Sequence, residues 1–304
     1  MNTIVLLAVH NGARWLDEQI SSILSQRAVS LRLFISDDRS KDSSSEICQR
    51  WSRADPRVIL LPPPPSRGCT SNFFHLIRSV PLQPDTYLAL ADQDDIWPPL
   101  KLKRAITQLR QQSAHGYSAN VTALWPSGRR SLIRKNHPQR KADFLFESPG
   151  PGCTFVLAPA LAQPLQTFLL QHPSLEHQVP IHDWFIYAWA RSRHYSWLID
   201  SRPALLYRQH DRNVLGVNQG IKAHLARLKS ALLGPTVTRM VRQAQLLYPD
   251  GNLPVPLHGT RISWLRLLFH ISHCRRRPRD RWLLACLLLL LAIAPGQPKS
   301  DNAV

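Results

Sequence analysis

The sequence predicts an α/β protein with a mostly parallel central sheet, flanking helices and a basic helical C-terminal extension. Two observations lead to this prediction. In the first hundred residues, short apolar runs alternate with segments of helical periodicity, as expected for parallel strands joined by crossover helices. Polar and acidic residues directly follow three of the apolar runs, at the end of the sheet where such folds bind ligands. At 304 residues, the chain is long enough to bury a sizeable core.

The elements of the first hundred residues follow from their periodicity. Apolar runs predict strands at residues 3–9, 31–36, 57–61 and 87–91. Apolar residues at helical spacing predict helices at residues 14–26, 43–53 and 71–80. Residues 62–65 are all proline, and they predict an extended loop because proline continues neither a helix nor strand pairing.

The second half of the chain repeats this alternation less regularly. It predicts a helix at residues 100–111, strands at 121–125 and 154–158, a helix from 182 to 193, and strands at 195–199 and 204–208. From Ile221 onward the pattern is helical and basic, with a loop rich in proline and glycine between Pro249 and Gly259. The sequence therefore predicts a domain of roughly 200 residues followed by a helical extension.

The charge balance favours a polyanionic partner. Lysine and arginine number 38 against 20 aspartate and glutamate, a net charge of +18, which suits nucleic acid, acidic lipid or a phosphorylated substrate. Five arginines directly precede the apolar run 282–294: Arg275, Arg276, Arg277, Arg279 and Arg281. A basic cluster beside an apolar segment indicates an anionic membrane surface. Because the run is shorter than the roughly 20 residues that span a bilayer, we expect it to lie at that surface or to complete the fold as a packed helix.

The five cysteines are widely spaced and form no CxxC pair. This spacing argues against a disulfide framework and against a structural zinc site. A reducing cytosol is the simplest compartment for such a chain.

Acidic residues gather at the predicted strand ends. Asp37 and Asp38 end the second strand, and the fourth is followed by Asp92, Asp94 and Asp95. Three carboxylates so close together need a cation, and oxygen ligands suit Mg²⁺ or Mn²⁺. An acceptor at the end of the second strand suits a nucleoside hydroxyl. The alternative for both groups is a solvated turn that caps the following helix.

The order of these motifs resembles glycosyltransferase family 2, which has the nucleotide-diphospho-sugar transferase fold, also called the A-type glycosyltransferase fold. The motifs are His10-Asn11-Gly12, Ser36-Asp37-Asp38-Arg39-Ser40, Asn72-Phe73-Phe74 and Asp92-Gln93-Asp94-Asp95-Ile96-Trp97. Three later segments resemble the rhamnosyltransferase-like branch, which acts in bacterial surface polysaccharide assembly: Gly152-Cys153-Thr154, His182-Asp183-Trp184 and Tyr207-Arg208-Gln209-His210. The resemblance covers about the first 215 residues.

The resemblance implies a role for each matching position. The residues that bind the nucleotide-sugar donor would be His10, Asn11, Asp37, Asp38, Asp92, Gln93 and Asp95. A divalent metal, Mg²⁺ or Mn²⁺, would be held by Asp94 and Asp92, with His210 as a further candidate. Asp183 would be the catalytic base. The residues that bind the acceptor would be Trp97, Trp184, Gly152, Cys153 and Thr154.

The resemblance also implies a reaction and its partners. A sugar, rhamnose being one candidate, would pass with inversion from the nucleotide diphosphate to a hydroxyl of a glycan or polyprenyl-diphosphate-linked acceptor. Residues 1–215 would be the catalytic domain, with a nucleotide-binding half at 1–98 and an acceptor-binding half at 99–215. Residues 216–304 would form the basic extension. We expect the protein in the cytoplasm, peripherally bound to the inner face of the cytoplasmic membrane.

Two departures from the family pattern stand out. Arg39 occupies a position where the family usually has glycine, and Asp211-Arg212 replaces a pair of glycines after His210. Arg39 either binds phosphate in place of a loop amide or marks a loop that has drifted.

Two other functional classes explain parts of the sequence. A basic protein that binds nucleic acid or acidic membranes and retains a vestigial transferase site explains the charge, but it leaves the ordered carboxylates without a purpose. We therefore do not expect nucleic acid as the partner. A metal-dependent phosphohydrolase would use Asp92 and Asp94, but Ala8, Val9 and His10 supply no carboxylate nucleophile after the first strand.

Overall fold

The computed structural model describes residues 1–210 and 235–293. The chain divides into two compact units, one formed by Met1–His137 with Ser148–Val217 and the other by Pro138–Glu147 with Asn218–Val304. The boundary expected near residue 215 lies outside the described residues, as does Asp211-Arg212. Residues 138–147, placed by the sequence in the first domain, group with the C-terminal helices.

The first unit is built on a seven-stranded sheet with the order β3-β2-β1-β4-β8-β5-β9. The strands are β1 (Asn2–Val9), β2 (Ser30–Asp37), β3 (Val58–Leu61), β4 (Tyr87–Ala91), β5 (Gly116–Ala119), β8 (Val156–Leu157) and β9 (Trp197–Asp200). All neighbouring pairs are parallel except those that involve β8. The predicted mostly parallel sheet is therefore confirmed, and β1, β2 and β4 end side by side.

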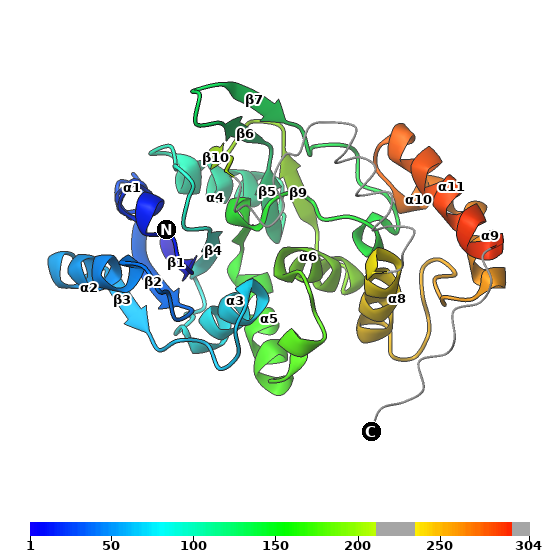
Figure 1. The fold of residues 1–304 in the computed structure, drawn as a ribbon, viewed down its shortest axis with the longest axis horizontal. Coiled ribbons are helices and arrows are strands. Elements are labelled where there is room, and N and C mark those ends of the chain that lie inside the picture. Colours follow the sequence, from blue (N-terminus) through cyan, green and yellow to red (C-terminus); the bar gives the residue numbers. More distant parts are fainter. Residues whose placement is uncertain (211–234, 294–304) are drawn as a thin grey trace. The chain divides into compact units, whose positions relative to one another are not determined.

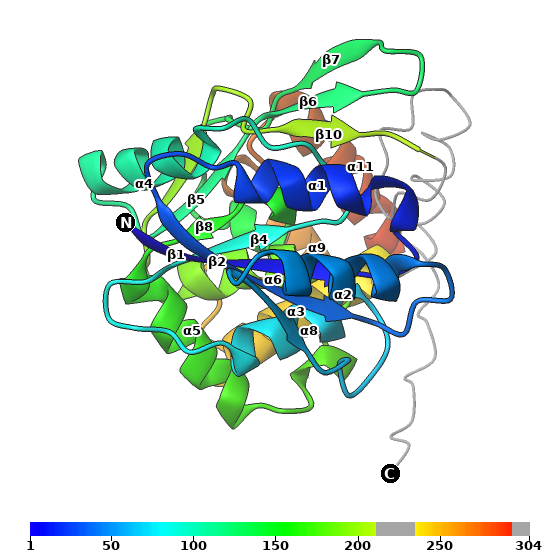
Figure 2. The ribbon, with the colours of Figure 1, turned by 90° about the vertical axis from the view of Figure 1, so that its left-hand side faces the viewer.

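Helices cover both faces of this sheet (Figures 1 and 2). On one face, α1 (Ala13–Leu24), α2 (Ser44–Ala54) and α4 (Lys101–Gln111) form one apolar cluster with β1, β2 and β4. On the other face, α3 (Cys69–Ser79) packs on β1 and β2 and contacts α5 (Pro159–Gln171) and α6 (His182–Ser192). The first unit therefore has three layers. Of these elements, β5 and α5 were not predicted from the sequence.

A second, three-stranded sheet has the order β10-β6-β7. Its strands are β6 (Val121–Leu124), β7 (Arg130–Ile133) and β10 (Leu206–Arg208). The backbones of Leu206 and Ile96 exchange two hydrogen bonds of 3.0 and 3.1 Å. This bridge fixes β10, and the residues that follow it, beside the loop after β4.

The second unit consists of helices in its described part. These are α8 (Pro235–Leu247), α9 (Arg261–Leu268), α10 (Ile271–Cys274) and α11 (Pro278–Ile293). The 3-10 turn η1 (Asp143–Leu145) belongs to the same unit and contacts α8 and α10. The helix α11 packs against α9 and α10 and contains all of the described part of the predicted apolar run. In residues 1–210 and 235–293, no helix combines the length and the apolar character needed to cross a membrane.

Candidate active site

The acidic loop after β4 is held in place by a polar row on α1. The side chain of Gln19 donates to the carbonyl of Asp92 (2.7 Å), and Ser22 Oγ accepts from the backbone N–H of Trp97 (3.1 Å). One turn further, Gln26 donates to the carbonyl of Pro98 (2.7 Å). Gln19 and Ser22 lie on one face of α1, and Gln26 lies just after the helix ends, so α1 and the turn that follows it hold the backbone of the loop.

Gln93 joins the acidic loop to the end of β1. Its side chain accepts from the backbone N–H of His10 (2.7 Å) and donates to the carbonyl of His10 (3.0 Å). A Cβ on Gly12 would lie 2.4 Å from the Gln93 side chain. Only glycine at position 12 leaves room for this pair of hydrogen bonds.

Asp94 and His210 lie together although they are far apart in the sequence. His210 Nε2 is 2.7 Å from Asp94 Oδ2, and the His210 ring stacks on Trp15 with centroids 4.1 Å apart. Arg208 also donates to the carbonyl of Asp94 (3.0 Å) and pairs with Glu18. The β10 bridge thus brings the His210 imidazole nitrogen within hydrogen-bonding distance of the Asp94 carboxylate.

Asp92 and Asp95 share a second group with Cys153. One ligand atom from each of these residues lies within 4.8 Å of the others. Burial, reinforced by the charges of Asp94 and Asp183, raises the pKa of Asp92 to about 7. Burial raises the pKa of Asp95 well above its usual range, with further contributions from Asp94 and Asp92.

The buried end of this group contains Lys101 and Trp97. The Lys101 ammonium lies 3.2 Å from the centre of the Trp97 ring, and its positive charge lowers the pKa of both Asp92 and Asp95. Burial lowers the pKa of Lys101 itself to about 7. The Cys153 thiol also lowers the pKa of Asp95, but the pKa stays raised, so Lys101 and Cys153 offset the crowded negative charge only in part.

These residues fit a divalent cation. Carboxylate oxygens from one loop, with an imidazole nitrogen beside them, are the donors expected for Mg²⁺ or Mn²⁺. Because the pKa values of Asp92 and Asp95 are raised, keeping both carboxyl groups ionised costs free energy in the folded protein. Cys153 does not contribute a thiolate, because burial and the nearby carboxylates raise the pKa of its thiol well above its usual range.

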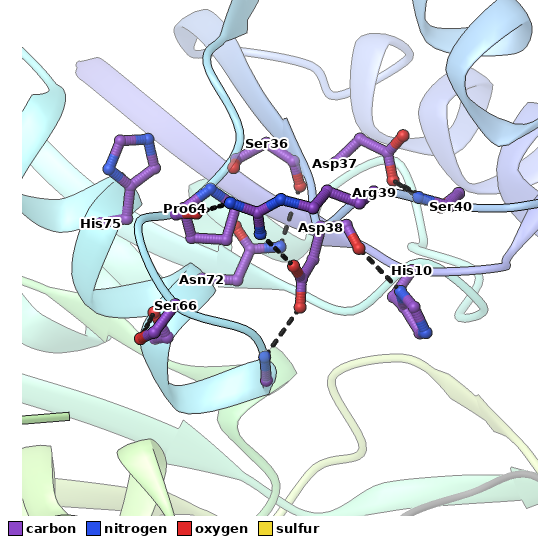
Figure 3. A network of polar contacts seen from close by, with 12 residues as sticks. His10, Ser36, Asp37, Asp38, Arg39, Ser40, Pro64, Ser66, Asn72 and His75 are labelled. Carbon is purple, nitrogen blue, oxygen red and sulfur yellow. Dashed lines mark hydrogen bonds and ion pairs between the residues drawn. The ribbon is translucent and has the colours of Figure 1, made fainter. Parts of the chain in front are cut away.

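Asp38 lies at the end of β2 and is almost entirely buried. Figure 3 shows its carboxylate between two donors, the guanidinium of Arg39 (3.0 Å) and the backbone N–H of Gly68 (2.7 Å). The ring of His10 lies 2.9 Å from the carbonyl of Asp38. The loops after β1 and β2 and the residue that precedes α3 therefore converge on Asp38.

Arg39 ties the β2 loop to the proline run. Its second guanidinium nitrogen donates to the carbonyl of Pro64 (2.7 Å), and its backbone φ is +54°. The side chains of Ser36 and His75 hydrogen-bond to the carbonyl of Pro62 in the same run. A positive φ is the reason that glycine suits this position, and in this chain the arginine offsets that strain with two hydrogen bonds.

Asp37 and Asn11 stabilise the loops around Asp38. The carboxylate of Asp37 accepts from both the backbone and the hydroxyl of Ser40 (Figure 3). Asn11 accepts from the backbone N–H of Lys41 (2.7 Å), and its own N–H donates to Ser40. Both residues therefore stabilise loop geometry in this structure, and their contact with the donor stays a prediction.

Asp183 lies in the first turn of α6. Its two oxygens accept from the backbone N–H groups of Gly152 (3.1 Å) and Trp184 (2.5 Å). A Cβ on Gly152 would come within 3.0 Å of Asp183, so glycine allows this close approach. Burial raises the pKa of Asp183 to about 6 despite these hydrogen bonds. A carboxyl with this pKa takes up a proton more readily than an exposed aspartate does.

His182 is a site residue that the sequence reasoning missed. Its ring is buried, stacks on Phe73 with centroids 4.1 Å apart, and has Nδ1 3.7 Å from Cys69 Sγ. Burial lowers the pKa of His182 to about 3, so the ring is neutral. Burial therefore dominates the pKa of the adjacent Asp183, because His182 adds no positive charge.

The side chains of the predicted acceptor residues are largely buried. Trp97 and Trp184 are almost entirely buried, and the side chains of Cys153 and Thr154 are completely so. The hydroxyl of Thr154 donates to the carbonyl of Pro151 (2.7 Å), which shapes the turn that brings Gly152 to Asp183. Their contact with an acceptor stays a prediction.

Lys101, Cys69 and Trp15 also belong to the site, although no sequence motif pointed to them. Cys69 is exposed at the start of α3, and four carboxyl groups act on its thiol by their charge: Asp92, Asp183, Asp94 and Asp38. A stronger signal existed in and just after α1, where Gln19 is buried among apolar residues of the helix and Ser22 and Gln26 follow it at helical spacing.

Such a sheet, with its acidic loop, is the architecture of glycosyltransferases with the A-type fold, and solved structures agree. The chain resembles S. aureus TarS in complex with UDP-GlcNAc at 13% identity and a TM-score of 0.51, over 96% of this chain and 88% of that one. It resembles the mannosyltransferase PcManGT of Pyrobaculum calidifontis, in complex with GDP-Man and Mn²⁺, at 16% identity and a TM-score of 0.52, over 98% and 76%. At these identities, the likeness establishes the fold alone.

The family follows from sequence. The chain belongs to glycosyl transferase family 2, whose family model matches residues 4–158. It is 36% identical over 289 residues to the dTDP-rhamnosyl transferase RfbG of Shigella flexneri, which covers 93% of this chain and 99% of the relative. The resemblance drawn from the motifs is confirmed, and the chain is a glycosyltransferase.

Proposed function

We propose that this glycosyltransferase transfers rhamnose from dTDP-rhamnose, with inversion, to a glycan hydroxyl in cell-surface polysaccharide assembly. The convergence of four carboxyl groups carries the proposal. Asp38 follows β2, Asp92 and Asp94 lie in the loop after β4, and Asp183 lies in α6, so they come from three different segments. Gly152 donates to Asp183, and the ligand atom of the adjacent Cys153 lies within 4.8 Å of those of Asp92 and Asp95. A donor-binding half and a proton-accepting group therefore border a common space.

The donor assignment rests on the relative and on Asp38. The full-length relative that is 36% identical is a dTDP-rhamnosyl transferase. A thymine or uracil base carries an N–H group, and a carboxylate held by Arg39 and Gly68 is an acceptor for that donor. Base recognition by Asp38 would exclude bases that present only an acceptor at this position.

A divalent cation at Asp94 and Asp92, with His210 beside them, would neutralise charge on the diphosphate leaving group. Asp94 and His210 already approach within 2.7 Å. Asp95 and Lys101 are buried next to Asp92, so their charges would influence how strongly the site attracts a cation.

Asp183 would act as the base. An acceptor hydroxyl is a weak nucleophile, and a carboxylate within hydrogen-bonding reach takes its proton as the oxygen attacks the anomeric carbon. Attack from the face opposite the diphosphate inverts the configuration of that carbon. The pKa of about 6 keeps Asp183 ionised at neutral pH while making it more basic than an exposed aspartate.

The acceptor would be a glycan on a polyprenyl diphosphate at the inner face of the cytoplasmic membrane. The net charge of +18 favours encounter with such an anionic acceptor and its membrane. The enzyme would work on the cytoplasmic side, where nucleotide sugars are made.

A panel of nucleotide sugars tests the proposal. The purified enzyme is incubated with each donor, Mn²⁺ and a polyprenyl-diphosphate-linked glycan, and the anomeric configuration of the product is read by NMR. We expect turnover of dTDP-rhamnose, an inverted product, and a loss of at least about a hundredfold in the Asp94→Ala variant or after metal chelation. Absence of turnover and of binding with every nucleotide sugar would instead favour the non-catalytic basic binding protein.

A further inference from the structure

The helix α11 is apolar around its whole circumference but is buried on one side only. Leu284, Leu287 and Leu288 are buried, and α11 packs against α9. The opposite stripe recurs at helical spacing, contains no charged residue and is exposed: Trp282, Leu283, Cys286, Leu289, Leu290 and Ile293. A helix that is apolar all round is normally buried all round, so the exposed stripe requires a partner.

The helix α9 presents a comparable stripe. Its buried side chains are Ser263, Trp264 and Leu267. Its exposed stripe, extended to the residue that ends the helix, mixes apolar and basic residues: Arg261, Ile262, Leu265, Arg266 and Phe269. Phe269 has an exposed fraction of 88% and Trp282 one of 76%. Of the thirteen large hydrophobic residues exposed in the described chain, eight lie on these two helices or at their ends.

We call these eight residues the α9–α11 apolar face: Ile262, Leu265, Phe269, Trp282, Leu283, Leu289, Leu290 and Ile293. These side chains lie on two helices that pack against each other, and a concentration of exposed apolar side chains marks an interaction site. The face needs an occupant that is apolar.

The charge around the face specifies the occupant further. Residues 261–293 contain seven arginines and one carboxylate, Asp280. Arg276 is not available to a ligand, because it is buried with Asp143 and Glu147. Arg281 donates to the carbonyls of Arg275 and Arg276. The structure thus refines the sequence expectation: part of the arginine cluster holds the unit together, and exposed basic charge lies on Arg261, Arg266 and Arg279, the last of which also pairs with Asp280.

We propose that the α9–α11 apolar face inserts into the surface of a bilayer containing anionic lipids, with α11 lying along the membrane. Apolar side chains then enter the headgroup boundary, and the exposed arginines contact lipid phosphates. An occupant that is both apolar and negatively charged matches this surface better than a second copy of a chain with net charge +18. The proposal rests on the proposed function only for its purpose, which is to hold the enzyme near a lipid-linked acceptor.

Vesicle binding of the full chain tests the proposal. The protein is sedimented with vesicles of phosphatidylcholine alone or mixed with phosphatidylglycerol. We expect binding to the mixed vesicles that weakens as salt is added. The double variant Phe269→Asp with Trp282→Asp should lose at least about tenfold in binding. The matched control, Leu132→Asp with Leu170→Asp, replaces apolar side chains exposed by 55% and 56% in the first unit and should bind like the wild type.

Three outcomes would overturn the proposal. The wild type fails to bind the anionic vesicles, the Phe269 and Trp282 variant binds them unchanged, or light scattering shows a wild-type oligomer that this variant dissolves, which would assign the face to a second copy. Binding of dTDP is measured on the same samples. A vesicle-binding protein that does not bind nucleotide would count against the proposed function and leave the membrane surface standing.

Discussion

The hydrogen-bonding and charged neighbours of each carboxyl group in the site determine which ligand that group can bind. Asp38 is fixed by two hydrogen-bond donors, Asp94 lies beside an imidazole, and Asp183 accepts from two backbone N–H groups. Asp92 and Asp95 are crowded together with one buried lysine nearby. In the proposed mechanism, the same side-chain type therefore serves base recognition, cation binding and proton transfer.

The pH dependence of transfer should report the base. Asp183 acts as a base only when ionised, and burial raises its pKa to about 6. We expect kcat to fall about tenfold per pH unit below this pKa and to reach a plateau above it. The measurement is kcat at saturating donor, acceptor and metal across this range. A kcat that stays constant down to about pH 4.5 would contradict the role of Asp183.

Gly12→Ala should disturb the donor site through Gln93. The new Cβ would lie 2.4 Å from Gln93 Cδ, which forces the side chain away from its two hydrogen bonds with His10. We expect a loss of about 1–2 kcal/mol in the free energy of unfolding and weaker nucleotide binding, measured by urea titration and calorimetry. The double variant with Gln93→Ala separates the causes: if Gly12→Ala costs as much there as in the wild type, the clash with Gln93 is not the reason.

At the scale of elements, periodicity predicted the first four strands and the three helices between them to within a few residues. The small strand β5 and the helix α5 were missed, because Gly116 weakens one pattern and Pro164 interrupts the other. The segment expected as a strand at 154–158 is β8 with only two residues, preceded by a 3-10 turn. That turn brings Gly152 to Asp183, so a tertiary contact at the site, and not local strand propensity, determines the backbone conformation here.

The polar row on α1 yields a matched pair of variants. Ser22 accepts a hydrogen bond from the backbone of Trp97, whereas the neighbouring Ser21 is exposed. Ser22→Ala leaves the Trp97 N–H without its acceptor and should cost about 1–2 kcal/mol in the free energy of unfolding. Ser21→Ala should change it by less than about 0.5 kcal/mol. Equal effects in chemical denaturation would show that α1 does not anchor the acidic loop.

At the scale of the whole molecule, the predicted fold class is confirmed, and motif order was sufficient to find the family. Sequence alone could not supply the contacts that depend on tertiary structure. His210 reaches Asp94 only through the pairing of Leu206 with Ile96, and Lys101 reaches the carboxylates only because α4 packs under the loop. The grouping of residues 138–147 with the C-terminal helices rests on the ion pairs of Arg276, which no local pattern reveals.

In the proposed mechanism, donor binding and proton transfer are separate tasks that different carboxyl groups of one site perform. Asp183→Asn keeps the shape of the side chain and removes its basicity, while Asp38, Asp92 and Asp94 are untouched. The decisive measurement compares this variant with the wild type in calorimetric binding of dTDP with Mn²⁺ and in sugar transfer. We predict dTDP affinity within about threefold of the wild type and a loss of transfer of at least about a thousandfold. Transfer near the wild-type rate, or loss of dTDP binding along with transfer, would contradict the claim.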